Sequence, residues 1–161
     1  MKNHAICFVC TGNICRSPTA EGVLASMAKR ARLAVVADSA GTHGYHIGEA
    51  PDPRSIKAAA RRCYDLTALR ARKLERNDFD RFKLILAMDR GHLEYLRKSS
   101  PCPNNPNIQL LMKYSSRFGE IDVPDPYFGN TAGFEQVLDL IEDAVAGLVT
   151  SLGSKDISRE A

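Results

Sequence analysis

The sequence contains no apolar run that approaches the ~20 residues needed to span a bilayer, so we expect no membrane partner. Its net charge of +3 over 161 residues is too small to indicate a nucleic-acid partner. Internal repeats and low-complexity segments are absent as well. Near the N-terminus, Lys2 is followed only by a short apolar run without a small-residue cleavage site. We therefore expect no signal peptide and a cytoplasmic location.

Ligand patterns for a metal are also missing. Cys7 and Cys10 match C-x-x-C, but the residues between them belong to an expected strand. Neither a second such pair nor a pair of histidines at ligand spacing occurs, so we expect no metal ion and no cofactor. The five cysteines are an odd number, which fits a reducing compartment better than a secreted fold held by disulfides.

The sequence does have enough apolar material for one core, since 44% of its residues are apolar and 25% are charged. The length suits a single domain of residues 1–161, with a frayed polar end at 153–161. Short apolar segments predict strands at 5–9, 33–38, 83–88 and 107–111. Helical spacing predicts helices at 53–62, with Asp52 as N-cap, after Asp89, and at 133–152.

Short strand–helix–strand connections imply right-handed crossovers and therefore a parallel sheet. Ligand sites in open parallel sheets lie outside the carboxyl ends of the strands. Cys10 follows the first expected strand, and residues 39–42 follow the second. Both observations place a site at the same edge of the sheet.

The stretch from Cys10 to Pro18 lies between the first strand and a helix with apolar residues at 23, 24 and 27. Pro18 suits the first turn of a helix, where free N–H groups and the helix dipole bind anions. Gly12 allows the loop to curl, and Arg16 can bind two oxygens of an oxyanion through its planar fork.

The same electrostatic field favours the thiolate form of Cys10, and the Ser17 hydroxyl can donate to its sulfur. A nucleophile inside an anion-binding loop suits phosphoryl transfer through a covalent intermediate. A cysteine and an arginine six residues apart are weak evidence by themselves, because most cytosolic cysteines are inert core residues.

Two further sets of polar residues are expected to lie at the surface. The basic residues at 61, 62, 70, 72, 73 and 76 are expected to form a solvated surface, with a landing area for acidic phosphopeptides as the alternative. His43 and His46, in the glycine- and proline-rich segment 41–53, are expected to be solvated.

The stretch Cys10–Pro18, together with the later segment Asp125-Pro126-Tyr127, resembles the low-molecular-weight protein tyrosine phosphatases. The resemblance extends from residue 6 to about residue 152, and three further segments match in order: 38–42, 51–54 and 87–89. It implies an α/β fold with a four-stranded parallel sheet in the order 2-1-3-4 and helices on both faces. It also implies hydrolysis of protein phosphotyrosine.

The resemblance assigns roles to individual residues. Cys10 is the nucleophile, Arg16 holds the phosphate, and Asp125 protonates the leaving phenoxide before acting as a base. Without the family, the Pro-Asp-Pro sequence around Asp125 would indicate only a rigid turn. The expected phosphate-binding loop comprises Thr11, Gly12, Asn13, Ile14, Cys15 and Ser17. The expected cleft residues are Tyr45, Tyr127 and Phe128, and Ser39 supports the loop through Asn13.

Aromatic walls make a deep slot that a long aryl phosphate can fill and a seryl phosphate cannot, which explains a preference for tyrosine. The expected partner is a protein that carries phosphotyrosine, with a tyrosine kinase as one candidate, and the expected state is a monomer or weak dimer. The resemblance also implies that Cys15 protects Cys10 through a reversible disulfide. One departure concerns Leu69, which occupies the position where the family commonly has a histidine that supports Asn13.

Three other functions remain as alternatives. An arsenate reductase of this fold needs further redox cysteines after the third strand, and residues 86–100 contain none. A protein-arginine phosphatase resembles this chain but carries threonine where Ile14 stands. A non-catalytic phosphate-binding module would need neither Cys10 nor Asp125.

Overall fold

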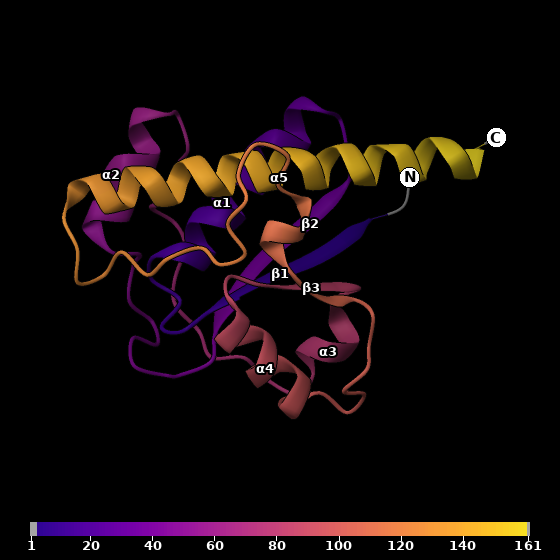
Figure 1. Cartoon of the computed structure of the whole chain (residues 1–161), viewed down its shortest axis with the longest axis horizontal. Coiled ribbons are helices and arrows are strands. Elements are labelled where there is room, and N and C mark those ends of the chain that lie inside the picture. The colour runs from indigo at the N-terminus through magenta and orange to yellow at the C-terminus, as the bar shows by residue number, and fades with distance from the viewer. Residues whose placement is uncertain (1–2, 161) are drawn as a thin grey trace.

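The computed structural model describes the backbone of residues 3–160 and the side chains of residues 3–155. Strands and helices alternate along the chain (Figure 1). Their bounds are β1 His4–Cys10, α1 Arg16–Arg30, β2 Val35–Gly41, α2 Pro53–Arg61, α3 Asp78–Arg81, β3 Leu84–Ala87, α4 Arg90–Ser99, β4 Ile108–Leu110, the 3₁₀ turn η1 Leu111–Tyr114, and α5 Thr131–Glu160.

The four strands form one parallel sheet in the order β2-β1-β3-β4, which confirms the expected fold. Strand β1 is central, so its last residues have neighbours on both sides. Cys10 lies opposite Gly41 of β2, and Val9 lies opposite both Ala40 of β2 and Ala87 of β3. The nucleophile predicted from sequence therefore stands at the carboxyl end of the best-supported strand.

Alternation along β1 fills a core on each face of the sheet. Ile6, Phe8 and Cys10 belong to the larger core, which α1, α2 and α5 cover. Cys7 and Val9 face the smaller core, to which α4 contributes Leu96 and α3 contributes Phe79. Figure 1 shows α1, α2 and α5 together on one side of the sheet and α3 and α4 on the other, so the predicted helices on both faces are confirmed.

The signals for the starts of α2 and α4 are confirmed. Asp52 caps α2, with Pro53 at its first position, and Asp89 caps α4 by accepting the His92 N–H at 2.9 Å. The apolar stripe predicted for 133–152 is buried along α5. The predicted end of this helix at 152 is wrong, because the helical backbone continues through polar residues to Glu160. No helix within residues 3–160 is long and apolar enough to cross a membrane.

The prediction that the basic residues form a solvated surface is wrong for two of the arginines. Arg62 pairs with three carboxylates of α5, those of Glu135, Asp139 and Glu142. Arg72 lies between Asp78 at 2.9 Å and Asp38 at 3.1 Å, and Asp78 is fully buried. The sequence shows the cations as one run, but the fold separates them and gives these two structural partners.

Candidate active site

The loop between β1 and α1 turns sharply enough to place Asn13 at a φ of 58°, in the left-handed region. Asparagine tolerates this region better than most residues. The end of β2 packs directly beneath the loop: a Cβ added to Gly41 would lie 2.7 Å from the Thr11 carbonyl oxygen. Only glycine allows this approach, which brings residues 39–42 against the loop as the parallel sheet predicted.

The loop leaves a row of backbone donors free. Within the described chain, no N–H group from Thr11 to Ser17 donates a hydrogen bond to another protein group. These groups lie where β1 ends and α1 begins, so the positive end of the α1 dipole adds to their field. Such a concave run of N–H groups at a helix N-terminus is suited to a tetrahedral oxyanion.

Asn13 fastens the loop in this shape through its side chain. Its Nδ2 donates to Ser17 Oγ at 2.8 Å and to Ser39 Oγ at 2.9 Å. Its Oδ1 accepts the backbone N–H of Arg72 at 2.9 Å. Asn13 and both serines are at least 95% buried, so these bonds are shielded from water. The loop is therefore tied to β2 and to the segment before α3.

The direction of these bonds orients the Ser17 hydroxyl. An amide Nδ2 can only donate, so Ser17 Oγ accepts from Asn13 and its own proton is free. Cys10 Sγ lies 2.9 Å from Ser17 Oγ. The Ser17 proton therefore points at the sulfur, which stabilises negative charge there.

Arg16 is held by two groups that lie outside the loop. Its Nη1 donates to Asp89 Oδ2 at 2.8 Å and to the Val123 carbonyl at 2.9 Å, and the side chain is 4% exposed. Burial alone would raise the pKa of Asp89, but the His92 N–H and ring, followed by Arg16, outweigh it and lower the pKa. Asp89 is thus ionised and fixes the guanidinium in one place.

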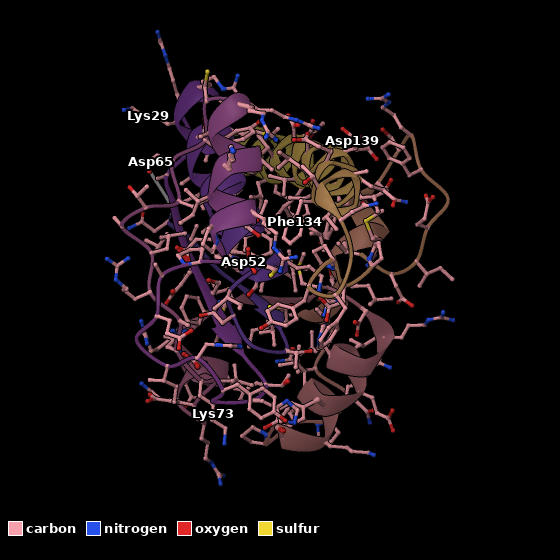
Figure 2. All side chains as sticks on the ribbon, turned by 90° about the vertical axis from the view of Figure 1, so that its left-hand side faces the viewer. Lys29, Asp52, Asp65, Lys73, Phe134 and Asp139 are labelled. Atoms are coloured by element: carbon pink, nitrogen blue, oxygen red, sulfur yellow. The ribbon has the colours of Figure 1, made fainter. Side chains whose placement is uncertain are left out.

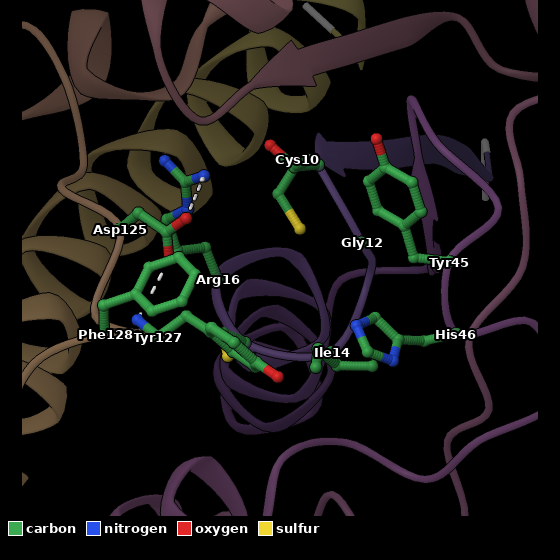
Figure 3. Close-up of a pocket in the computed structure, with 11 residues that line it drawn as sticks. Cys10, Gly12, Ile14, Arg16, Tyr45, His46, Asp125, Tyr127 and Phe128 are labelled. Atoms are coloured by element: carbon green, nitrogen blue, oxygen red, sulfur yellow. Dashed lines mark hydrogen bonds and ion pairs between the residues drawn. The ribbon is translucent and has the colours of Figure 1, made fainter.

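Asp125 lies within reach of Arg16 but is held more loosely. Its Oδ2 is 3.7 Å from Arg16 Nη2, and its Oδ1 accepts the Tyr127 N–H at 3.0 Å. The side chain is 48% exposed. Cys10, Arg16 and Asp125 line one pocket, so the structure brings together the three residues predicted to carry the chemistry (Figure 3).

Aromatic rings surround the mouth of this pocket, and Ile14 forms part of its wall. Tyr127 and Phe128 pack edge to face with ring centroids 4.9 Å apart, on the side of Asp125. Tyr45 stands on the other side, separated from them in Figure 3 by the loop that carries Cys10. Phe128 is 93% exposed and Tyr45 70%, so both rings are accessible to a substrate.

Arg54 connects the first turn of α2 to the segment that carries Asp125. Its Nη2 donates to Asp52 at 2.9 Å and to the Tyr127 carbonyl at 2.9 Å. Its guanidinium also lies 4.5 Å from the ring centroid of Phe134. Figure 2 labels Phe134 and Asp52 on the side of the molecule that faces the viewer. Asp52 in turn donates its N–H to the Ile14 carbonyl at 2.8 Å, so both loops share this anchor.

Sequence reasoning missed His46, which was expected to be solvated. The structure places its ring in the pocket lining, where a Cβ added to Gly12 would lie 3.0 Å from it. Its Nδ1 pairs with Glu49 Oε2 at 2.8 Å. The only sequence signal was its position beside Tyr45. His43 is exposed as expected, but stacks on Tyr45 with centroids 5.1 Å apart.

The departure at Leu69 does not leave the loop network incomplete. Leu69 packs against the larger core, while Asn13 has three partners without it. Ser39 Oγ donates onward to Glu21 Oε1 at 2.8 Å. Burial raises the pKa of Glu21 to about 7, and the bond from Ser39 partly offsets that rise. Neither Glu21 nor the Arg72 backbone was identified from the sequence.

Cys15 is 5% exposed, occupies the N-cap position of α1 without a side-chain capping hydrogen bond, and carries a free thiol. Burial raises the pKa of Cys15 to about 12, and the nearby charge of Asp52 adds to this. Cys15 is therefore a neutral thiol in the resting site. The Cys10 sulfur differs in its contact, because it lies 2.9 Å from the Ser17 hydroxyl oxygen.

A family model described as low molecular weight phosphotyrosine protein phosphatase matches residues 5–158. The chain is 42% identical to a low molecular weight protein-tyrosine-phosphatase of Streptomyces coelicolor, over 98% of this chain and 99% of that one. Similar solved structures include a protein tyrosine phosphatase of Entamoeba histolytica with Hepes in its active site. That structure has a TM-score of 0.91 and 34% identity, and the match covers 95% of this chain and 99% of that chain. YfkJ of Bacillus subtilis has a TM-score of 0.90 at 34% identity, covering 96% and 98%.

Proposed function

We propose that this chain, which belongs to the low molecular weight phosphotyrosine protein phosphatase family, hydrolyses phosphotyrosine on proteins through a cysteinyl-phosphate intermediate. The observation that carries the proposal is the position of the Cys10 sulfur, which accepts a hydrogen bond from the Ser17 hydroxyl at the base of a loop of free N–H groups. The site thus combines a nucleophile with an oxyanion cradle.

In the first step, the free N–H groups of the loop and the Arg16 guanidinium bind the phosphate dianion. The Cys10 thiolate attacks phosphorus on the side opposite the phenolic oxygen. The S–P bond forms as the P–O bond breaks, and Asp125 gives its proton to the departing oxygen. Because tyrosine is a poor leaving group, this proton transfer lowers the barrier substantially.

In the second step, the Asp125 carboxylate takes a proton from a water molecule as that water attacks phosphorus. The S–P bond breaks and inorganic phosphate leaves. The departing sulfur becomes a thiolate again, and the Ser17 hydroxyl stabilises it. Cys10 and Asp125 thereby return to their starting protonation states.

The pocket walls support selectivity for an aryl phosphate. Ile14 offers an apolar contact at the loop, and Tyr45 and Tyr127 flank the opening. A tyrosine ring can fill this slot and reach Cys10, whereas a seryl phosphate is too short to make the same contacts. We propose that the physiological substrate is a protein carrying phosphotyrosine, with a tyrosine kinase among the candidates.

The test is phosphate release from three matched peptides that carry phosphotyrosine, phosphoserine or phosphoarginine. Wild type should release phosphate from the phosphotyrosine peptide alone, and Cys10→Ser should abolish release. Preference for the phosphoarginine peptide would instead assign the protein-arginine phosphatase activity. Failure with all three, together with thiol-dependent arsenate reduction, would replace the phosphatase proposal by a reductase.

We also propose that the site is redox-sensitive and that Cys15 protects Cys10 by forming a disulfide with it. Both cysteines are buried beside the same loop and carry free thiols. Peroxide should inactivate the enzyme, and a thiol reductant should restore it in wild type but much less in Cys15→Ser. Equal recovery of the variant would contradict the protective role.

A reducing compartment such as the cytoplasm suits this chemistry, because Cys10 must stay reduced to act. We propose that the chain works there as one domain of residues 1–161, as a monomer or weak dimer. The match of the family model over residues 5–158 supports the single domain.

A further inference from the structure

Two side chains far apart in the sequence meet beside the anion-binding loop. Thr11 follows the nucleophile directly, and His92 lies in the first turn of α4. Thr11 Oγ1 is 2.9 Å from His92 Nε2. The His92 side chain is 7% exposed, so the contact is protected from water. Neither residue has a role in the mechanism above beyond the Thr11 backbone N–H.

His92 also contacts the carboxylate that holds Arg16. Its Nδ1 lies 3.1 Å from Asp89 Oδ1, and its backbone N–H donates to the same oxygen at 2.9 Å. The Nδ1 contact is close but is not an aligned hydrogen bond. The other Asp89 oxygen accepts from Arg16 at 2.8 Å. A continuous path therefore runs from Thr11 through His92 and Asp89 to Arg16.

The charges around His92 determine the direction of the Thr11 bond. Burial lowers the pKa of His92 to about 4, and the positive charge of Arg16 adds to this, against the carboxylates of Asp89, Asp125 and Asp122. The ring is thus neutral at pH 7 and carries one proton. That proton belongs on Nδ1, facing the Asp89 carboxylate, because a lone pair there would be repelled. His92 Nε2 therefore accepts a hydrogen bond from the Thr11 hydroxyl.

We propose that His92 is a positioning residue of the phosphate site: it holds the first residue of the anion-binding loop and the Asp89–Arg16 pair at a fixed separation. The inference rests on the proposed phosphatase function, because it assigns the bound group as a phosphate-like oxyanion. The Thr11 N–H belongs to the free donors at the start of the loop, and Arg16 is the charged residue at its other end, where α1 begins. Linking the two through one ring keeps both ends of the cradle in register before an oxyanion arrives.

Three substitutions of His92 separate this role from simple packing. Glutamine places an amide near the position of Nε2 and can still accept from Thr11. Asparagine places its amide near Nδ1 and reaches only the Asp89 side. Leucine fills similar space without any polar atom. Thr11→Val removes the same hydrogen bond from the other partner, at a position that is only half-buried.

The measurement is the dissociation constant of tungstate, a tetrahedral oxyanion, by calorimetry, alongside kcat and KM for an aryl phosphate and the thermal midpoint. We expect His92→Leu, His92→Asn and Thr11→Val each to weaken tungstate binding about fivefold to tenfold, as loss of a buried hydrogen bond predicts. KM should rise by a similar factor, and His92→Gln should recover most of the binding. In the double variant His92→Leu/Thr11→Val, the Thr11 change should add no further loss.

Tungstate binding by His92→Leu that equals wild type, with only a lower thermal midpoint, would reduce His92 to a packing residue and overturn the proposal. Additive losses in the double variant would overturn it too, since the two residues would then act separately. Wild type that neither binds tungstate nor hydrolyses aryl phosphate would overturn the proposed function itself. This last result is distinguishable, because it appears before any substitution is made.

Discussion

The two loops that meet at Cys10 are held in different ways. In the loop from Cys10 to Ser17, Asn13 and Ser17 are almost fully buried and joined by side-chain hydrogen bonds to each other and to β2. The loop that carries Asp125 is anchored at Val123, whose N–H donates to the Met88 carbonyl at 2.8 Å, and at the Tyr127 carbonyl, which accepts from Arg54 at 2.9 Å. Between these anchors it is largely exposed.

This difference matches what each loop has to do. An oxyanion cradle works best when its donors are fixed before the charge arrives, because no reorganisation is then needed. In the proposed mechanism, the loop that carries Asp125 donates a proton and must admit and release an aromatic substrate. The buried hydrogen bonds of the Cys10–Ser17 loop are thus suited to binding the phosphate, and the exposure of the Asp125 loop is suited to substrate entry and release in the proposed reaction. Substitutions that affect activity and stability separately would test this division.

Asp125→Asn should have the largest effect, and it should be confined to activity. Removal of the general acid is expected to lower kcat for a phosphotyrosine peptide ~10²–10⁴-fold, the usual range for acid–base catalysis. The thermal midpoint should change little, because the side chain is half exposed and asparagine can still accept the Tyr127 N–H.

A matched substrate provides the control for Asp125. With para-nitrophenyl phosphate, whose phenoxide leaves more readily, the loss in kcat should be much smaller. An equal loss with both substrates would mean that Asp125 does not protonate the leaving group. A large fall in the thermal midpoint would break the comparison of the two loops.

Asn13→Ala should lower both stability and activity. It removes three hydrogen bonds, two of them buried and one partly buried, and places alanine at a φ of 58°, so we expect the free energy of unfolding to fall by roughly 2–4 kcal/mol. Denaturant unfolding measures this change, and kcat should fall in parallel as Ser17 loses its orientation.

Asn13→Gly separates the two contributions to the Asn13 effect. Glycine loses the same bonds but accepts the backbone conformation, so its loss of stability should be smaller than that of alanine while kcat falls similarly. Alanine and glycine variants with wild-type stability would show that the loop needs no fastening, which would contradict the comparison.

Glu21 gives the smallest expected effect, and one that depends on pH. The pKa of Glu21 is about 7 in the fold and lies above its unfolded value of 4.5, so folding favours the protonated form. Its contribution to stability is fully present below pH 4.5 and is lost as pH rises through 7. Glu21→Gln, which stays neutral, should therefore raise the free energy of unfolding at pH 8 relative to wild type by about 1–3 kcal/mol.

The comparison at low pH provides the control for Glu21. At pH 4 the two proteins should differ little, because Glu21 is largely protonated there in both the folded and the unfolded state. A difference that does not change between pH 4 and pH 8 would show that Glu21 does not titrate in this range. Because Ser39 Oγ can still donate to the glutamine oxygen, kcat should remain close to that of wild type.

Local patterns in the sequence were enough to identify those parts of the site that depend on residues close together in the chain. The strand, loop and helix around Cys10 and the caps at Asp52 and Asp89 each depend on neighbours within a few residues. The strand order came from the family resemblance and not from the pattern, because pairing of β1 with β3 joins residues almost 80 positions apart.

The residues that the sequence did not reveal depend on contacts between distant segments. His92 meets Thr11 across 81 positions, and the Arg72 backbone meets Asn13 across 59. Nothing in the periodicity of α4 distinguishes His92 from a solvated residue. Its one signal was position, in the first turn of a helix that begins at the carboxyl end of β3, where the parallel sheet places ligands.

The central place of β1 has a consequence for how such a protein can evolve. Cys10 ends a strand that is paired on both sides and completely buried over its last residues, so substitutions next to it disturb the main core. Phe128 and Tyr45 are exposed by 93% and 70% and contribute little to that core. Under the proposed function, mutations can therefore accumulate at the rim and change which partners are recognised, while the chemical step at Cys10 is inherited unchanged with the fold.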